Sequence, residues 1–109
     1  MTTDNPSAPS PVSFINIITL KPGKLDEFIA IQTTELPKLA ANISGFRESR
    51  LHRSLDKDRA VMIATFDTIE DHKRWVAQPE FIAHRARLAP LIESVDNGYG
   101  ELVYEGRRP

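Results

Sequence analysis

Apolar and polar residues along the chain follow two periods in turn, and the first part of the pattern predicts a strand followed by a long helix. Residues 12–20 form a nearly continuous run of β-forming apolar residues. A Lys-Pro-Gly turn signal follows at 21–23. From residue 25 to 43 the apolar residues recur at helical spacing, with a polar interruption at Gln32. Pro37 removes a backbone donor, so we expect it to kink this helix or restart it.

The remaining pattern predicts two strands, a helix in two pieces and a last strand. Residues 46–55 and 59–66 are β-like and flank a polar turn at 56–58. Thr68 is positioned to cap a short helix, and Pro79 suits the first position of another helix. We place the last strand at residues 98–106.

The resulting order, β-α-β-β-α-β, predicts an α+β fold of the ferredoxin-like type. In this fold the helices cover one face of an antiparallel sheet. Such a sheet normally has one apolar and one polar face. The first strand instead has Phe14, Ile18 and Leu20 on one face, with Ile15 and Ile17 on the other. Because one chain can cover only one face, we expect a homodimer with its two sheets face to face.

Length and composition set the class of protein. The 109 residues fit one domain, which we place at residues 12–109 after a proline-rich leader, 1–11, that we expect to be disordered. Fourteen basic and fifteen acidic side chains leave a net charge of -1, which gives no electrostatic reason to expect nucleic acid or membrane as a partner. The chain has no cysteine and no signal-peptide pattern, so we expect a cytoplasmic protein without thiol chemistry.

Asn16 is the one amide within the apolar first strand. The strand's hydrogen-bond ladder does not need this side chain, and burial of an unpaired amide is costly. Asn16 therefore either pairs inside the protein or faces a ligand.

Several segments together resemble the antibiotic biosynthesis monooxygenase (ABM) family. The resemblance is carried, in order, by the segments FINIITL, KPGKLDEF, SGFRESRLHRSLDKDRAVMIATF, QPEFIAH and LVYEG. It implies a dimeric α+β barrel of ferredoxin-like subunits. In this family, polyketide anthrone oxygenases and related quinol oxidases use O2 without metal or flavin, and another branch degrades haem. The resemblance therefore implies an oxygenase with no bound cofactor or metal, acting on a small aromatic or quinol substrate.

The resemblance also assigns positions in the pocket. Asn16 matches an Asn that faces the substrate pocket, where it would orient the substrate and stabilise its anion. Met62 and Phe66 stand where the anthrone oxygenases have Asn and Trp, so we expect a more apolar pocket. Such a pocket suits a second hypothesis, a protein that binds an apolar metabolite without oxidising it.

Haem is a third hypothesis. Asn16 and Trp75 match the haem-degrading branch, whose axial His lies about ten residues beyond the Trp. His84 lies nine residues after Trp75, one residue short of the expected position. One residue on a helix is a rotation of about 100°, which is enough to turn a ligand away from the iron.

The remaining candidates are histidines and aromatic residues. His84 shares a helical stripe with apolar residues, so it is either the catalytic base or a core residue with its hydrogen bonds satisfied. We expect His52 to take part in a charge network or dimer contact. Tyr99 and Tyr104 could each serve the pocket or the interface. The expected substrate-binding residues are Phe14, Met62, Phe66, His72, Trp75 and Phe81.

Overall fold

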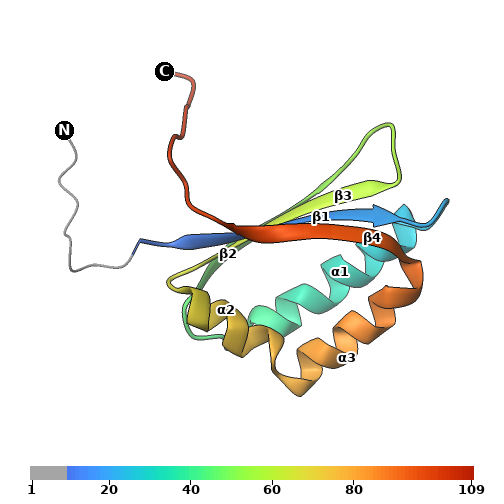
Figure 1. The fold of residues 1–109 in the computed structure, drawn as a ribbon, viewed down its shortest axis with the longest axis horizontal. Helices are drawn as coiled ribbons and strands as arrows, with labels where there is room; N and C mark the ends of the chain where they lie inside the picture. The colour runs from blue at the N-terminus through green and yellow to red at the C-terminus, as the bar shows by residue number, and fades with distance from the viewer. Residues whose placement is uncertain (1–9) are drawn as a thin grey trace.

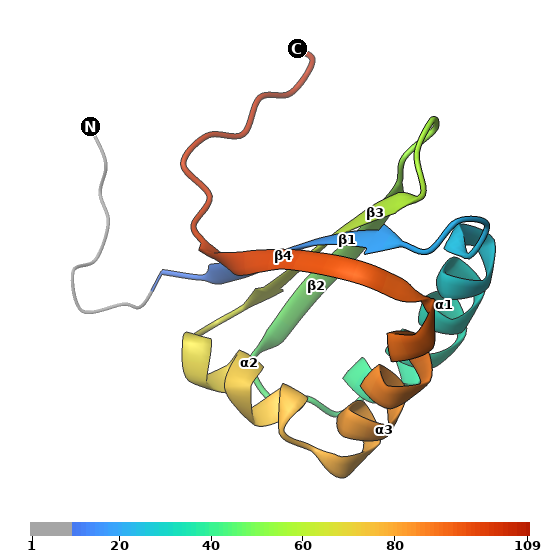
Figure 2. The ribbon, with the colours of Figure 1, turned by 45° about the vertical axis from the view of Figure 1, so that its right-hand side comes forward.

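The computed structural model describes residues 10–109 and shows the ferredoxin-like α+β arrangement (Figure 1). The elements are β1 (Val12–Leu20), α1 (Leu25–Ala40), β2 (Phe46–Arg53), β3 (Arg59–Phe66), α2 (Ile69–Val76), α3 (Pro79–Leu88), the short 3-10 helix η1 (Ala89–Leu91) and β4 (Ile92–Gly100). The strands form one antiparallel sheet in the order β2-β3-β1-β4. Figure 2 shows α1, α2 and α3 on the same side of this sheet. The predicted fold class is confirmed.

The predicted helix signals are present in the structure. Thr68 caps α2: its hydroxyl accepts a hydrogen bond from the Asp71 backbone N–H at 3.1 Å and donates to the Asp71 carboxylate at 2.9 Å. Pro79 occupies the first turn of α3. Helix α1 continues through Pro37, so the prediction of a restarted helix is wrong, and α1 ends at Ala40 rather than at residue 43.

Two strand boundaries require correction. Strand β4 spans Ile92–Gly100, not 98–106. Its Asn97-Gly98 dipeptide favours a turn in isolation, but pairing along β1 holds it extended. Residues 101–109 form no regular element. Strand β2 ends at Arg53 rather than at residue 55, because the Ser54 hydroxyl accepts backbone hydrogen bonds that close a turn.

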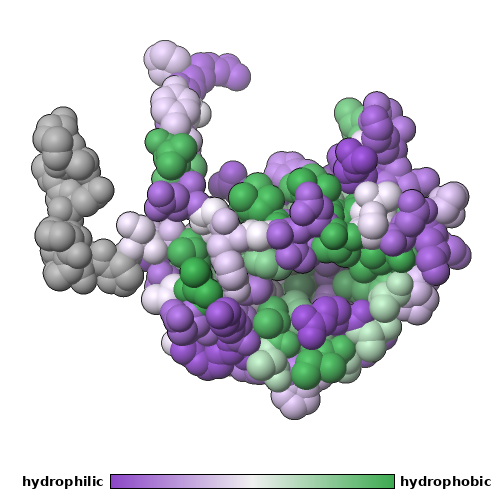
Figure 3. Space-filling model, in the orientation of Figure 1, coloured by the Kyte–Doolittle hydropathy of each residue, from purple (hydrophilic) through white to green (hydrophobic). Residues whose placement is uncertain are grey.

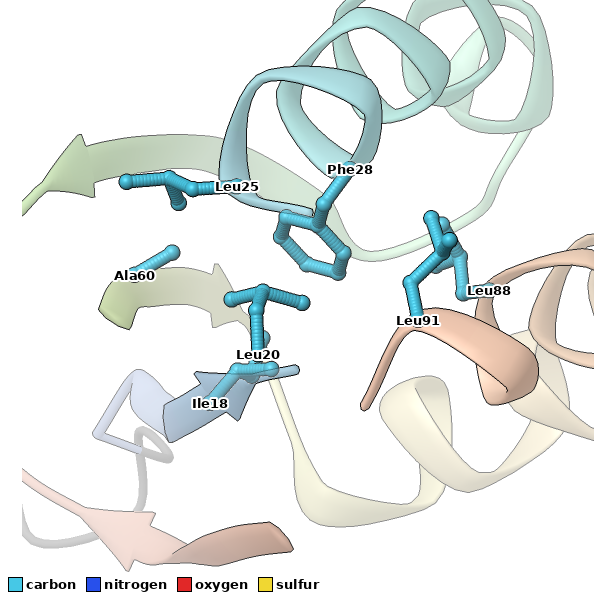
Figure 4. Packing of buried hydrophobic residues seen from close by; sticks show 7 residues of the cluster. All are labelled: Ile18, Leu20, Leu25, Phe28, Ala60, Leu88 and Leu91. Atoms are coloured by element: carbon cyan, nitrogen blue, oxygen red, sulfur yellow. The ribbon is translucent and has the colours of Figure 1, made fainter. Parts of the chain in front are cut away.

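Two separate clusters of buried apolar side chains form the core. The first cluster joins β1, β3, α1, α3 and η1 (Figure 4), and it consists of Ile18, Leu20, Leu25, Phe28, Ala60, Leu88 and Leu91. The second cluster centres on Ala64, Phe66 and Trp75, beneath the start of β1. Both clusters contribute residues to the same cavity, described below.

The helix-free face of the sheet carries an apolar stripe. Ile15 pairs with Ile63 and Ile17 pairs with Val61 across β1 and β3. Ile15 and Ile17 are each 37% exposed. The sequence predicted a second apolar face of the sheet that this chain does not cover, and the structure shows this face. Within residues 10–109, no helix is long and apolar enough to cross a membrane. The predicted leader falls mainly on residues 1–9, which lie outside the described part of the chain.

Candidate active site

A cavity of about 330 Å³ lies between the sheet and the helices. Figure 3 shows the surface hollowed between β4 and the helices. The lining of the cavity is mostly apolar, with a few polar groups, which is the usual character of a small-molecule site. The lining residues are Phe14, Asn16, Ile18, Phe28, Gln32, Leu36, Met62, Ala64, His72, Trp75, Val76, Phe81, His84, Arg85, Leu88, Ile92, Val95 and Asn97.

Asn16 brings an unsatisfied amide into this cavity. It lies in the middle of β1, between Met62 of β3 and Asn97 of β4. Its Oδ1 is the one buried side-chain polar atom in residues 10–109 that has no hydrogen-bond partner. Because an orphaned buried polar atom is costly, a ligand that bonds to it would remove that cost. Of the two alternatives for Asn16, the structure favours a residue facing a ligand.

His84 lies in the cavity wall within a polar network that joins α3 to α1. The imidazole is 2% exposed. Its Nδ1 lies 2.5 Å from Glu35 Oε1, and its Nε2 lies 2.7 Å from Gln32 Oε1. Arg87 donates to both oxygens of Glu35. An oxygen atom of α1 lies at hydrogen-bond distance from each ring nitrogen, so the arrangement does not favour His84 as a haem ligand.

Glu35 is the charged centre of that network. Hydrogen bonds from Arg87 and, next, from His84 lower the pKa of Glu35 from 4.5 to about 2. The same contact raises the pKa of Arg87. Glu35 is therefore ionised throughout the physiological range and can hold an Nδ1–H of His84 in place.

His72 lies at the other end of the cavity, on α2. Its ring stacks on Phe14 with centroids 4.2 Å apart, and its Nδ1 lies 2.8 Å from the Tyr99 hydroxyl. Burial lowers the pKa of His72 below its ordinary 6.5, so the neutral imidazole predominates at neutral pH. Burial and the charge of Glu70 raise the pKa of Tyr99. The pair therefore forms a neutral, hydrogen-bonded end wall.

Most of the expected substrate-binding residues line the cavity. Phe66 does not, which differs from our prediction. It is fully buried, and its ring lies 5.4 Å from Trp75 and 5.2 Å from His72, so it supports the wall from behind. Trp75 lines the cavity and donates from Nε1 to the Leu39 carbonyl oxygen at 3.2 Å, near the end of α1. The expected residues that line the cavity are Phe14, Met62, His72, Trp75 and Phe81, and their role in substrate binding stays a prediction.

The structure places the two candidate tyrosines and His52 in different parts of the molecule. Tyr99 joins the pocket through His72, whereas Tyr104 is exposed and lies beyond β4. His52 lies on β2 opposite Val61, beside the apolar stripe, and is exposed. The charge network or dimer contact expected for His52 stays a prediction.

Sequence reasoning missed four polar residues of the site. Glu35 was not singled out, and Gln32 was seen only as a polar interruption in an apolar stripe. That interruption was the available signal, because a buried amide needs a partner. Arg85 lines the cavity, with its guanidinium 5.7 Å from the centre of the Phe81 ring. Asn97 was hidden by the incorrect placement of the last strand.

Comparisons with solved structures agree with this architecture. SnoaB from Streptomyces nogalater, described as a cofactor-independent oxygenase, is 28% identical, with a TM-score of 0.73 over 92% of this chain and 96% of that one. Two further structures show the same fold at lower identity. A protein from Nitrosomonas europaea assigned to antibiotic biosynthesis monooxygenases has a TM-score of 0.78 at 15% identity, covering 88% and 93% of the two chains. Rv0793 from Mycobacterium tuberculosis has a TM-score of 0.74 at 18% identity, covering 90% and 100%.

Sequence comparison gives the family. A search of curated protein sequences gave no significant match. The family model described as "antibiotic biosynthesis monooxygenase" matches residues 11–87, which include β1 to most of α3. This match covers more than half of the chain and contains most of the cavity-lining residues, all except Leu88, Ile92, Val95 and Asn97. The chain belongs to the antibiotic biosynthesis monooxygenase family.

Proposed function

We propose that this protein is a monooxygenase that uses O2, without a bound cofactor, to oxidise a small aromatic or quinol-type substrate in the cavity. The observation that carries the proposal is the orphaned Asn16 Oδ1 in a mostly apolar cavity. Family membership supports monooxygenase activity in general. The likeness to SnoaB, a cofactor-independent oxygenase, supports the finer assignment.

The chemistry needs an electron-rich substrate and a site that favours its anion. An anthrone or hydroquinone that loses a proton becomes an enolate or phenolate, which can give an electron to O2. For an anthrone, the resulting radical and superoxide combine to a peroxide. Loss of water leaves a carbonyl, so that one oxygen atom of O2 enters the product and the other leaves as water. The protein contributes position and preorganised hydrogen-bond donors.

The side chains around the cavity can supply these functions. A turn about the Asn16 side-chain bond exchanges its oxygen and nitrogen, so the amide can accept from a neutral hydroxyl or donate to the anion. Phe14, Trp75 and Phe81 provide flat apolar walls for the ring. His84 is the proposed base. Its Nε2 reaches the cavity when the Gln32 amide turns aside, while Glu35 holds Nδ1.

Oxygen uptake tests this function. Chelator-treated protein is assayed against anthrones and hydroquinones beside a protein-free control for autoxidation, with Asn16→Ala as the test variant. The exposed turn residue Asn42 supplies a matched control, Asn42→Ala. We expect uptake that falls in Asn16→Ala and persists in Asn42→Ala. Equal uptake in Asn16→Ala and wild type would contradict the role of Asn16.

Met62 favours a second candidate function, binding of an apolar metabolite without turnover. It lies directly beside Asn16 on β3 and offers no hydrogen-bond donor to an anion. This candidate predicts saturable quenching of Trp75, the single tryptophan, by quinones, with no oxygen uptake. A titration with haemin tests the haem hypothesis separately, since a ligating His would give a shifted Soret band.

We also propose that a second copy of the chain covers the helix-free face. The apolar stripe on this face, in which Ile15 and Ile17 are exposed and Val61 and Ile63 are partly buried, supports an apolar interface. The segment after β4 adds Leu102, Val103 and Tyr104, which are 74%, 87% and 81% exposed. In Figure 1 this segment extends toward the same side of the sheet. Light scattering is expected to give the mass of a dimer, and a monomer at all concentrations would contradict the proposal.

A further inference from the structure

We propose that Asn97 is a second substrate-binding amide, and that Asn16 and Asn97 together bind one oxygen of the substrate. This inference deepens the proposed function and rests on it. It defines the substrate class more narrowly as a flat ring system that carries a hydroxyl or enolisable oxygen at the edge facing β1 and β4.

Strand register places the two amides side by side. Asn16 of β1 pairs directly with Asn97 of β4, and the register is unbroken from Ser13 to Thr19. Directly opposite residues on neighbouring antiparallel strands have Cβ atoms roughly 4.5–5.5 Å apart and share a face. Both side chains line the same cavity. Two amides at this separation can converge on one oxygen atom that lies between them.

The sheet offers Asn16 no other polar neighbour at this level. Its partner on β3 is Met62, and its same-face neighbours along β1 are Phe14 and Ile18. One amide donates to an oxyanion weakly compared with the two or more donors of an efficient oxyanion site. Asn97 supplies the missing donor from the opposite side of Asn16.

The missing partner of Asn16 Oδ1 indicates that the two amides are arranged to bind a ligand rather than each other. Asn16 Oδ1 accepts no hydrogen bond from Asn97, since it has no partner among residues 10–109, and it is therefore free to accept from a substrate. With Asn16 accepting from a substrate O–H, Asn97 can donate to the same oxygen. After proton loss both amides can donate to the anion. The pair thus fits the oxygen before and after ionisation.

Anaerobic binding of two probes tests the pair without requiring turnover. Isothermal titration calorimetry compares 1-naphthol with naphthalene, which lacks the oxygen, on wild type, Asn97→Ala, Asn16→Ala, the double variant and Asn42→Ala. We expect Asn97→Ala to bind 1-naphthol about 3- to 10-fold more weakly, the range for one lost hydrogen bond, and naphthalene unchanged. The two single losses are expected to be non-additive because both amides contact one oxygen. Asn42→Ala is expected to match wild type.

The outcomes separate this inference from the proposed function. Selective loss of 1-naphthol in Asn97→Ala supports the amide pair even if the protein consumes no O2. Equal effects on both probes, no effect on either, or no preference of wild type for 1-naphthol would overturn the pair. Asn97→Asp is the second variant: it keeps the size of the side chain but replaces the NH2 donor by a carboxylate. If it binds 1-naphthol as tightly as wild type, Asn97 does not donate to the oxygen.

Discussion

Replacement of Gly45 by Ala is expected to destabilise the protein strongly, because this glycine meets two requirements at once. It has φ +83°, a conformation that L side chains rarely adopt, and it opens the strand after α1. A Cβ at this position would overlap the carboxyl group of Asp71. Asp71 belongs to the capping box of α2, the helix that carries His72 and Trp75 into the cavity.

Gly23 provides the matched control for this substitution. Its φ is +78°, but a Cβ there would meet nothing within 4 Å. Gly23→Ala therefore has only the backbone cost, about 1–2 kcal/mol. Gly45→Ala adds overpacking against Asp71, about 1–3 kcal/mol more. The expected total for Gly45→Ala is about 2–5 kcal/mol.

Urea denaturation followed by circular dichroism measures both free energies of unfolding. We expect Gly45→Ala to lose at least about 1 kcal/mol more than Gly23→Ala. Equal losses would show that the space beside Asp71 does not matter and would refute the steric part of the argument.

Three further predictions concern the network, the wall and the interface. Since Glu35 has a folded pKa of about 2 against an ordinary 4.5, its stabilising effect is present above pH 4.5 and is lost as the pH falls toward 2. Glu35→Gln should therefore lower the Tm near pH 7, and the gap in Tm from wild type should narrow below pH 4.5 and close near pH 2. A gap that widens in acid would be contrary to this sign. Trp75→Phe removes the hydrogen bond to the Leu39 carbonyl and should cost about 1 kcal/mol or more in urea denaturation, whereas unchanged stability would mean that the bond contributes nothing. Ile17→Lys places a charge in the apolar stripe and should yield a monomer in light scattering, and a persistent dimer would locate the interface elsewhere.

Much of the fold was predictable because local signals and tertiary packing agree. Thr68 begins α2 and Pro79 begins α3, as their side chains predict. Strand β4 was not predictable in the same way. Its residues include Asp96, Asn97 and Gly98, and only pairing with β1 makes them a strand. We predicted the last strand at residues 98–106 because the segment after β4 is more apolar. In the structure Leu102, Val103 and Tyr104 of that segment are exposed.

The site was predictable only in part, for a related reason. Asn16 stands out because an amide within an apolar strand is anomalous. Phe66 was predicted to line the cavity like the other aromatic residues, because hydrophobic periodicity does not distinguish a lining residue from one buried behind the lining. The partners of His84 lie 52 and 49 positions away, on α1. Such long-range pairing cannot be read from helical spacing.

The most direct test of the central claim is the origin of the oxygen in the product. Wild type and Asn16→Ala are each incubated with an anthrone under ¹⁸O2, with chelator present, and the product is analysed by mass spectrometry. The account predicts that wild type forms a product carrying one ¹⁸O atom well above the protein-free rate, and that Asn16→Ala loses most of this excess. A labelled product formed equally fast by Asn16→Ala, or no excess with wild type, would contradict an oxygenase site built around Asn16.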